Sequence, residues 1–342
     1  MPTVPPRRAL VTGASGHLGA NLTRELLDQG WEVIPFVRVT SRLAGLEGLD
    51  VRVRYGDVLD RASLDVAMEG VDVVFHTAAV HRLWSKDPAT EIITPALEGT
   101  RNVLTAAAAA GIARVVHTSS CNTVGFTTDS DRPFAEDHYA EDPQLDYVRG
   151  KVESERLALR LGAELGIEVV VLNPTGILGP HDHRMTPTMG FARDILNGGP
   201  MLPGAQNLVH VRDVARAHVL AADRGEPGER YIIGGTNVDT EELGRHVFEL
   251  TGNRPSVLRG PKWLFLALGW LMETMARIRG GDPALTPALV RDALGRSPVF
   301  DVSKARDGLG FEGRGPREVL EDTLRWLESS GHGGAELHGR PR

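Results

Sequence analysis

A turn with regularly spaced glycines, lying between a short apolar run and a helical pattern, constrains this chain more than any other feature. Residues 9–11 predict a buried strand, and residues 20–29 predict an amphipathic helix. Glycines between them let the backbone approach a pyrophosphate closely and adopt angles that a Cβ disfavours. The helix directs its free N–H groups and the positive end of its dipole toward the anion. A dinucleotide-binding turn is therefore predicted, rather than a plain tight turn, at Gly13, Ser15, Gly16, His17, Leu18 and Gly19.

Strand and helix patterns alternate along the first half of the chain. Apolar or alternating runs predict strands at 33–37, 51–55, 71–75, 114–118 and 169–172, and helical patterns cover 96–110 and 145–164. This alternation predicts an α/β Rossmann fold, in which a doubly wound parallel sheet is accompanied by a smaller C-terminal substrate lobe. We assign residues 1–173 to the nucleotide-binding domain, with 206–233 returning to it. Residues 174–205 and 234–329 form the substrate lobe, and 330–342 a disordered tail.

Charge and cysteine content exclude several classes of partner and compartment. The chain has 342 residues and a net charge of −7 without a basic block, so we expect no nucleic-acid partner. Cys121 is the single cysteine, so no intrachain disulfide can form, which is typical of a reducing compartment. No apolar leader precedes the first strand, and we expect a cytoplasmic protein.

An apolar stretch at 263–272 is the one segment of interest for membrane contact. Its ten residues are too few for a membrane span, which needs about 20. We expect a buried or lid helix here, with Trp263, Phe265 and Trp270 lining an apolar lid or packing in the core.

The residues that follow the second predicted strand favour NADP(H) over NAD(H). An acid at this position suits the 2′-hydroxyl of NAD, whereas an arginine suits the 2′-phosphate of NADP. Here the chain has Arg38, and no acid occurs before Glu47. A solvated surface arginine is the alternative. Asp57 and Val58, after the third predicted strand, are expected near the adenine, although Asp57 also suits a turn.

A tyrosine and a lysine four residues apart open the helix predicted at 145–164. This spacing places the phenol of Tyr147 and the ammonium of Lys151 on one helical face, where the cation, helped by the positive oxidised nicotinamide, favours the phenolate. With its pKa lowered toward neutrality, Tyr147 could act as a general acid or base. Ser119 and Ser120 end the predicted strand upstream, where a serine hydroxyl could orient the reacting oxygen.

Together these motifs resemble the extended short-chain dehydrogenases/reductases. The likeness extends to about residue 329, and further segments that carry it are 173–176, 209–215 and 228–235. Within the family, segments 82–88 and 98–104 are most similar to the dihydroflavonol-4-reductase-like branch, which includes hopanoid-associated sugar epimerases. The resemblance implies that Tyr147 is the catalytic acid/base, Ser120 rather than Ser119 the catalytic serine, and Lys151 the residue that lowers the tyrosine pKa and holds the nicotinamide ribose. Further cofactor contacts are expected at Ala78, Ala79, Thr118 and Pro174.

Departures from the family patterns narrow the expected chemistry. Cys121 and Asn122 stand where sugar 4,6-dehydratases carry an Asp-Glu pair, and Gln206 stands where UDP-sugar epimerases carry an arginine for the diphosphate. His181 and His183 lack a third ligand, so we expect no metal site. We predict substrate contacts at His81, Trp84, Asn122 and His183, the last with a solvated loop as the alternative.

The prediction is an NADPH-dependent reductase, reversible as an alcohol dehydrogenase, that acts on a ketone or aldehyde of a bulky, largely apolar small molecule. An epimerase that works through a keto intermediate with retained NAD(H) is the alternative, and a non-catalytic NADP(H)-sensing regulator is the alternative of another class. The resemblance also implies a homodimer through the helices predicted at 96–110 and 145–164.

Overall fold

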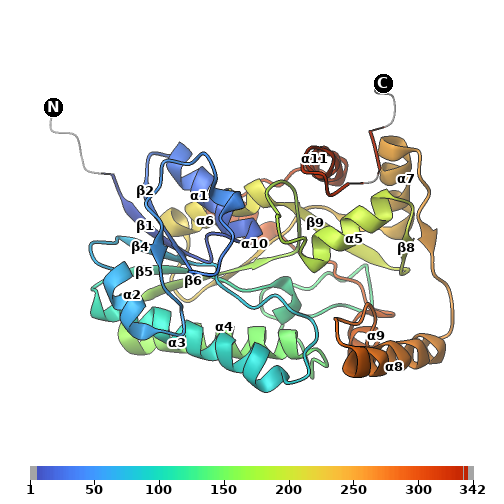
Figure 1. Ribbon diagram of the computed structural model, residues 1–342, viewed down its shortest axis with the longest axis horizontal. Helices are drawn as coiled ribbons and strands as arrows, with labels where there is room; N and C mark the ends of the chain where they lie inside the picture. Colours follow the sequence, from blue (N-terminus) through green and yellow to red (C-terminus); the bar gives the residue numbers. More distant parts are fainter. Residues whose placement is uncertain (1–5, 334, 338–342) are drawn as a thin grey trace.

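A seven-stranded parallel sheet forms the centre of the molecule (Figure 1). The structure, a computed structural model, describes residues 6–333 and 335–337. The strand order is β10-β6-β5-β4-β1-β2-β3, so the chain reverses direction across the sheet between β1 and β4. The strands are β1 (Arg8–Thr12), β2 (Glu32–Val37), β3 (Arg54–Tyr55), β4 (Val73–His76), β5 (Arg114–Thr118), β6 (Glu168–Pro174) and β10 (Arg230–Ile233). This is the doubly wound arrangement predicted from the alternating pattern.

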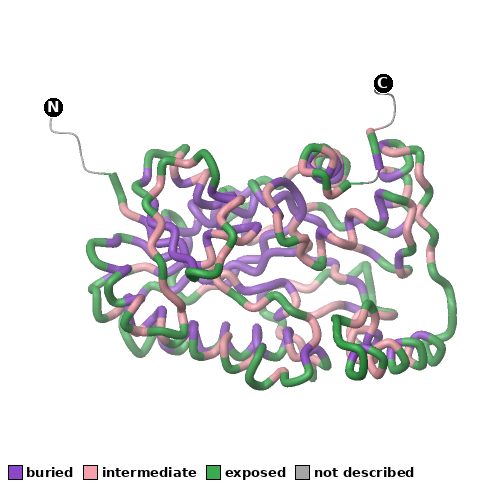
Figure 2. Tube along the Cα trace, viewed as in Figure 1, coloured by how far each residue is buried: buried purple, intermediate pink, exposed green. Residues whose placement is uncertain are grey.

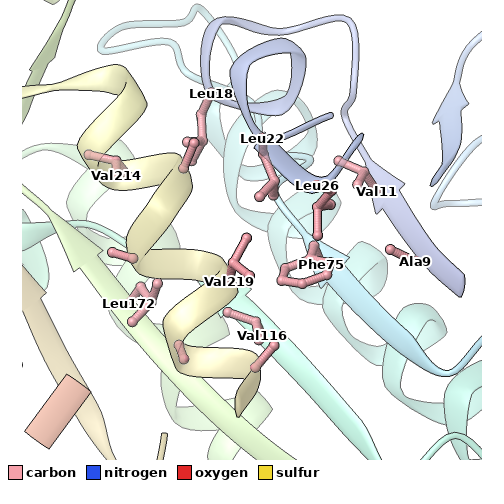
Figure 3. Packing of buried hydrophobic residues seen from close by; sticks show 14 of the residues in the cluster. Ala9, Val11, Leu18, Leu22, Leu26, Phe75, Val116, Leu172, Val214 and Val219 are labelled. Atoms are coloured by element: carbon pink, nitrogen blue, oxygen red, sulfur yellow. The ribbon is translucent and has the colours of Figure 1, made fainter. Parts of the chain in front are cut away.

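Helices cover both faces of this sheet because its strands are apolar on both sides. One face carries α1 (His17–Asp28), α6 (Val211–Arg224) and α10 (Ser303–Leu309), and the other carries α2 (Arg61–Ala67), α3 (Thr94–Ala109) and α4 (Asp146–Leu165). Figure 3 shows the first face, where the leucines of α1 and the valines of α6 meet above β4, β5 and β6. The labelled side chains there include Leu18, Leu22, Leu26, Phe75, Val116, Leu172, Val214 and Val219.

A smaller lobe follows β6 and has its own apolar core. Its three-stranded sheet contains β7 (Gly176–Leu178), β9 (Ala205–His210) and β11 (Asn237–Asp239), and a two-stranded sheet pairs β8 (Pro200–Met201) with β12 (Ser256–Val257). Its helices are α5 (Pro187–Leu196), α7 (Thr240–Thr251), α8 (Lys262–Arg279), α9 (Pro287–Ala293) and α11 (Pro316–Ser329). Within the described part of the chain, no helix combines the length and apolarity needed to cross a bilayer.

Two predicted features of the sheets differ in the structure. The strand predicted at 51–55 is reduced to β3, because β2 offers only Val37 and Phe36 as partners. The Gly56 N–H donates to the Val37 carbonyl, which shows that the backbone groups of odd-numbered residues in β2 face β3. Pro35 is one of these residues, and it has no N–H to donate to β3. The return of 206–233 to the nucleotide domain begins only at α6, because β10 occupies the sheet edge beside β6 and β9 pairs elsewhere.

Part of the tail predicted to be disordered is packed against α11. The ring of His332 stacks on Trp326, Ala335 is buried in the core of the small lobe, and the Leu337 N–H donates to a carboxylate oxygen of Glu328. Apolar and aromatic contacts with α11 therefore order 330–333 and 335–337 despite their glycine content. The rest of the predicted tail, residues 334 and 338–342, lies outside the described residues.

Candidate active site

The carboxyl ends of the parallel strands open into a cavity of about 580 Å³. Residues from the glycine turn, from the ends of β2, β3 and β4, and from the first turns of α4 form its wall. Such an edge is where open α/β sheets bind ligands. The cavity brings together these predicted site residues: Gly13, Ser15, Gly16, Arg38, Asp57, Val58, Ala78, Ala79, His81, Tyr147 and Lys151.

The glycine turn fits the pyrophosphate of a dinucleotide. Gly13 has φ +68°, and a Cβ there would lie 2.7 Å from the Cα of Ala78. A Cβ at Gly19 would collide with the carbonyl oxygen of Gly13, so this glycine lets α1 approach the turn. No side chain caps α1, and Gly16 at its N-cap borders the cavity, so the helix end is open to an anion.

Other predicted cofactor residues lie behind the residues that form the wall of the cavity. His17 and Leu18 are buried in α1, with Leu18 in the core under the turn. The Thr118 carbonyl accepts a bond from Lys151, and its hydroxyl is bonded to His218. The residues outside the cavity wall are His17, Leu18, Gly19, Thr118 and Pro174.

The predicted catalytic set lies together at the start of α4. This helix begins at Asp146, so Tyr147 and Lys151 occupy successive turns of one face, and both are buried. The Lys151 Nζ donates to the Thr118 carbonyl at 3.0 Å. The Ser120 hydroxyl lies near enough to the Tyr147 phenol to favour its ionised form, and its Oγ accepts from the Asn122 N–H at 3.3 Å. The structure therefore places Ser120 beside Tyr147, whereas the Ser119 hydroxyl is buried without a partner in the described chain.

Burial dominates the electrostatics of this set. It raises the pKa of Tyr147 to about 12, against the opposing effect of the nearby Ser120 hydroxyl. Burial also lowers the pKa of Lys151 to about 8, although the Glu155 carboxylate opposes this shift. In the chain without its cofactor, desolvation of the phenolate therefore dominates the pKa of Tyr147, and the expected lowering with an oxidised nicotinamide bound stays a prediction.

A buried ion pair that sequence reasoning missed supports this catalytic set. Glu155, four residues after Lys151, is fully buried, and its Oε1 lies 2.6 Å from the Arg230 Nε. Its Oε2 accepts from Thr123 at 2.8 Å and from Asn173 at 2.7 Å. Asn173 also donates to the Ser120 carbonyl at 3.2 Å. The pair therefore connects α4, β6 and β10 behind the serine, and its only sequence signal is a charged residue on the inner face of α4.

At the nucleotide end of the cavity, Arg38 directly follows β2 and is exposed. Its guanidinium forms no ion pair or hydrogen bond with the described residues, so it is available to a ligand. Asp57 serves the turn after β3, where its Oδ1 accepts from the Leu59 N–H at 3.0 Å, and it also borders the cavity. Sequence reasoning missed Arg184, whose Nη2 donates to the Ser15 Oγ at 3.2 Å across the glycine turn. Only the tertiary fold brings these two residues together.

Of the predicted substrate residues, His81 alone lines the cavity. Its ring centroid lies 5.2 Å from that of Tyr147, although His81 itself is exposed. Trp84, Asn122 and His183 lie outside the cavity wall. The His183 ring instead contacts Trp326 edge-on, with centroids 5.7 Å apart.

The predicted apolar lid is wrong for two of its three residues. Trp263 and Trp270 are 68% and 69% exposed, and only Phe265 is buried. The interior face of α8 is taken up by contacts with α9, which leaves both tryptophans on the outside. The rings of His181 and His183 are 6.3 Å apart, and the described residues contain no group of three acidic, cysteine or histidine side chains placed to hold a metal ion.

Comparisons with known proteins show what this chain is similar to. The model of the NAD dependent epimerase/dehydratase family matches residues 9–234. Sterol demethylase protein B of Methylococcus capsulatus is 35% identical over 330 residues, which cover 94% of this chain and 98% of that protein. A putative dihydroflavonol 4-reductase of Synechocystis sp. is 34% identical over 333 residues, covering 94% and 95%. The structure of MoeE5 in complex with UDP-glucuronic acid and NAD is similar, with a TM-score of 0.73, 27% identity and coverage of 94% and 99%.

Proposed function

Because this chain belongs to the NAD dependent epimerase/dehydratase family, as an NAD(P)-dependent oxidoreductase of the extended short-chain dehydrogenase/reductase type, we propose that it is an NADPH-dependent carbonyl reductase. Its substrate is the ketone or aldehyde of a bulky, largely apolar small molecule, and the reaction is reversible as an alcohol dehydrogenase. The observation that carries the proposal is the placement of Tyr147 and Lys151 on the cavity that the glycine turn also lines, with Ser120 near the tyrosine.

The chain's own residues account for the proton that carbonyl reduction requires. When bound, the nicotinamide supplies the hydride for the carbonyl carbon. Tyr147 donates its phenolic proton to the oxygen that becomes the alcohol, and Ser120 hydrogen-bonds the same oxygen. A pKa raised to about 12 keeps the phenol protonated at neutral pH, which is the form that a general acid needs. Lys151 has N–H groups left beside its bond to Thr118, and these suit the ribose hydroxyls.

The preference for NADPH is supported by the free guanidinium of Arg38. A guanidinium matches the geometry of a phosphate, and this one lines the cavity at the end of β2, where the adenosine ribose meets a Rossmann sheet. Arg184 supports dinucleotide binding in general, since it lies across the glycine turn rather than at the ribose.

An apolar substrate is supported by the relatives. The relatives are named for a sterol demethylase and a dihydroflavonol reductase, both of which point to polycyclic, largely apolar molecules. We propose a sterol-like or flavonoid-like alcohol or ketone as the substrate class.

An epimerase remains the second candidate, favoured by the similarity to MoeE5 with UDP-glucuronic acid and NAD bound. An epimerase returns the hydride to the same substrate and retains its cofactor, whereas a reductase releases it. Mass spectrometry of the purified protein separates the two: tightly retained NAD(H) supports the epimerase, and exchangeable NADPH supports the reductase.

Tyr147→Phe tests the mechanism, because it removes only the phenolic oxygen. We expect NADPH-dependent reduction of a polycyclic ketone to fall by about 10²- to 10⁴-fold, which is the usual contribution of general acid catalysis. NADPH affinity, followed by its fluorescence, should stay within about twofold. Tyr55→Phe is the matched control, since Tyr55 is 54% exposed on the edge strand β3. Full activity of Tyr147→Phe would refute the proposed role.

A further inference from the structure

The outer face of α8 is an apolar surface that no part of the described chain covers. Seven of its large apolar side chains are at least 40% exposed, and most of the other exposed large apolar residues are scattered singly over the molecule. Figure 2 shows this helix at the lower right, at the far end of the molecule from α2, with little of it buried. These seven residues, which we call the α8 face, are Trp263, Leu264, Leu268, Trp270, Leu271, Met275 and Ile278.

The packing of the opposite side fixes this orientation. Phe265, Gly269 and Ala276 are the buried residues of α8, and their spacing places them on one side of the helix. A Cβ at Gly269 would lie 2.9 Å from the backbone of Thr286, so helix and loop are in direct contact there. Rotation that buried the tryptophans would break this contact. The α8 face therefore stays on the outside of the folded protein.

Basic side chains flank this face at both ends. Residues 254–279 contain a single acidic residue, Glu273. Its carboxylate is paired with Arg277 at 2.7 Å. The segment is thus locally cationic, although the whole chain has a net charge of −7. Its exposed basic residues are Arg254, Arg259, Lys262, Arg277 and Arg279.

We propose that the α8 face docks this protein onto an anionic lipid surface. Tryptophan is favoured at the boundary between headgroups and acyl chains, where its ring is apolar and its N–H is in contact with water. Leucine, isoleucine and methionine can enter the acyl boundary, while flanking arginines and lysine meet anionic headgroups. The helix lies along the lipid surface, because its inner side is held against α9.

Charge argues against a second copy of the chain as the occupant of this face. Cations lie at both ends of α8, so pairing two such helices in either direction sets cation against cation. Anionic headgroups neutralise both ends at once.

The docked helix contacts a loop that contributes two residues to the wall of the cavity. The guanidinium of Arg277 lies 5.6 Å from the centre of the Trp84 ring, and the same loop carries His81 and Arg82, which line the cavity. Docking therefore brings this loop close to the lipid. The docking proposal itself does not depend on the reaction, so it can fail while the reductase proposal stands.

Vesicle flotation of the full chain tests the proposal. The vesicles contain phosphatidylcholine alone or mixed with phosphatidylglycerol. We expect the protein to float with the anionic vesicles, to be released by raised salt, and to stay behind with the neutral ones. Trp263→Ala/Trp270→Ala should weaken the partition by about tenfold or more, since it removes the large interfacial rings. Val66→Ala, at a 62% exposed position on α2, should change nothing.

Three readouts show whether a loss of binding is specific. Circular dichroism and NADPH affinity in vesicle-free solution should be the same in the double variant and the natural chain, since both tryptophans are exposed. Fluorescence of the natural chain should shift to the blue with anionic vesicles. Absence of flotation with anionic vesicles would overturn the proposal. The proposal would also be overturned if the natural chain formed dimers and the double variant did not, because a second copy would then cover the face.

Discussion

Replacing Arg38 by aspartate should convert the preference for NADPH that we propose for this protein into a preference for NADH. Arg38 follows β2, lines the cavity, and forms no ion pair with the described residues. Its removal therefore disrupts no interaction of the folded chain, and a change in cofactor affinity reports on the ligand contact alone. Aspartate offers an acceptor to the 2′-hydroxyl of NADH and repels the 2′-phosphate of NADPH.

The magnitude follows from the exposure of this arginine. A hydrogen bond to a charged group contributes about 1.5–3 kcal/mol, and an exposed one belongs at the lower end of this range. At about 1.4 kcal/mol per tenfold, Arg38→Ala should weaken NADPH binding about 10- to 30-fold. Like-charge repulsion of about 1 kcal/mol in water, plus one hydrogen bond gained by NADH, brings the selectivity change in Arg38→Asp to about 10²- to 10³-fold.

Titration of both cofactors by fluorescence, at one ionic strength, measures this change. Arg42→Asp is the matched control, because Arg42 is an exposed arginine four residues further along that does not line the cavity. It introduces the same change in net charge and should leave the ratio of the two affinities within about twofold. Equal ratios in Arg38→Asp and the natural chain would refute the assignment of NADPH through this residue.

Three further predictions follow from the structure. Glu155→Ala leaves the buried Arg230 guanidinium without its carboxylate partner. The free energy of unfolding, measured by urea titration, should therefore fall by about 3–5 kcal/mol, and a loss below about 1 kcal/mol would contradict this. Burial lowers the pKa of His76 to about 3 and of His218 to about 4, from an ordinary 6.5, so stability is full above pH 6.5 and falls as the pH drops toward 4. At pH 5 each histidine should cost about 2 kcal/mol of unfolding free energy, and equal stability at pH 7 and 5 would oppose this. Arg184→Ala should weaken NADPH and NADH equally, by about tenfold in fluorescence titrations, because the arginine lies over the turn common to both cofactors, and a loss for one cofactor alone would count against it.

Sequence patterns predicted the sheet well where local signals were strong. The glycine turn, the strands of the central sheet and α4 all lie within a few residues of their predicted bounds. The clearest miss among the strands, at 51–53, has a non-local cause, since the missing N–H belongs to Pro35 on the neighbouring strand. A strand's own residues cannot report what its neighbour offers.

The site was predicted only in part, because some of its properties also depend on residues far away in the chain. Tyr147 and Lys151 share a helix, so their spacing alone places them together. The partners of Lys151 and the depth of its burial depend on how α4 meets β5. The sign of the Tyr147 pKa shift is therefore a property of the tertiary structure. Likewise, α8 is apolar on nearly every side, and its sequence suggests burial as readily as exposure.

Local signals in the sequence were enough to predict the dinucleotide turn, the parallel sheet and the pairing of Tyr147 with Lys151, because glycine conformation, periodicity and helical spacing act over a few residues. The residues that share the cavity with that pair depend instead on how distant segments pack together. This packing brought Arg184 over Ser15, buried Glu155 against Arg230, and left the tryptophans of α8 outside. Each of these depends on contacts between residues far apart in the chain, and burial, which sets their charge and exposure, exists only once those contacts form.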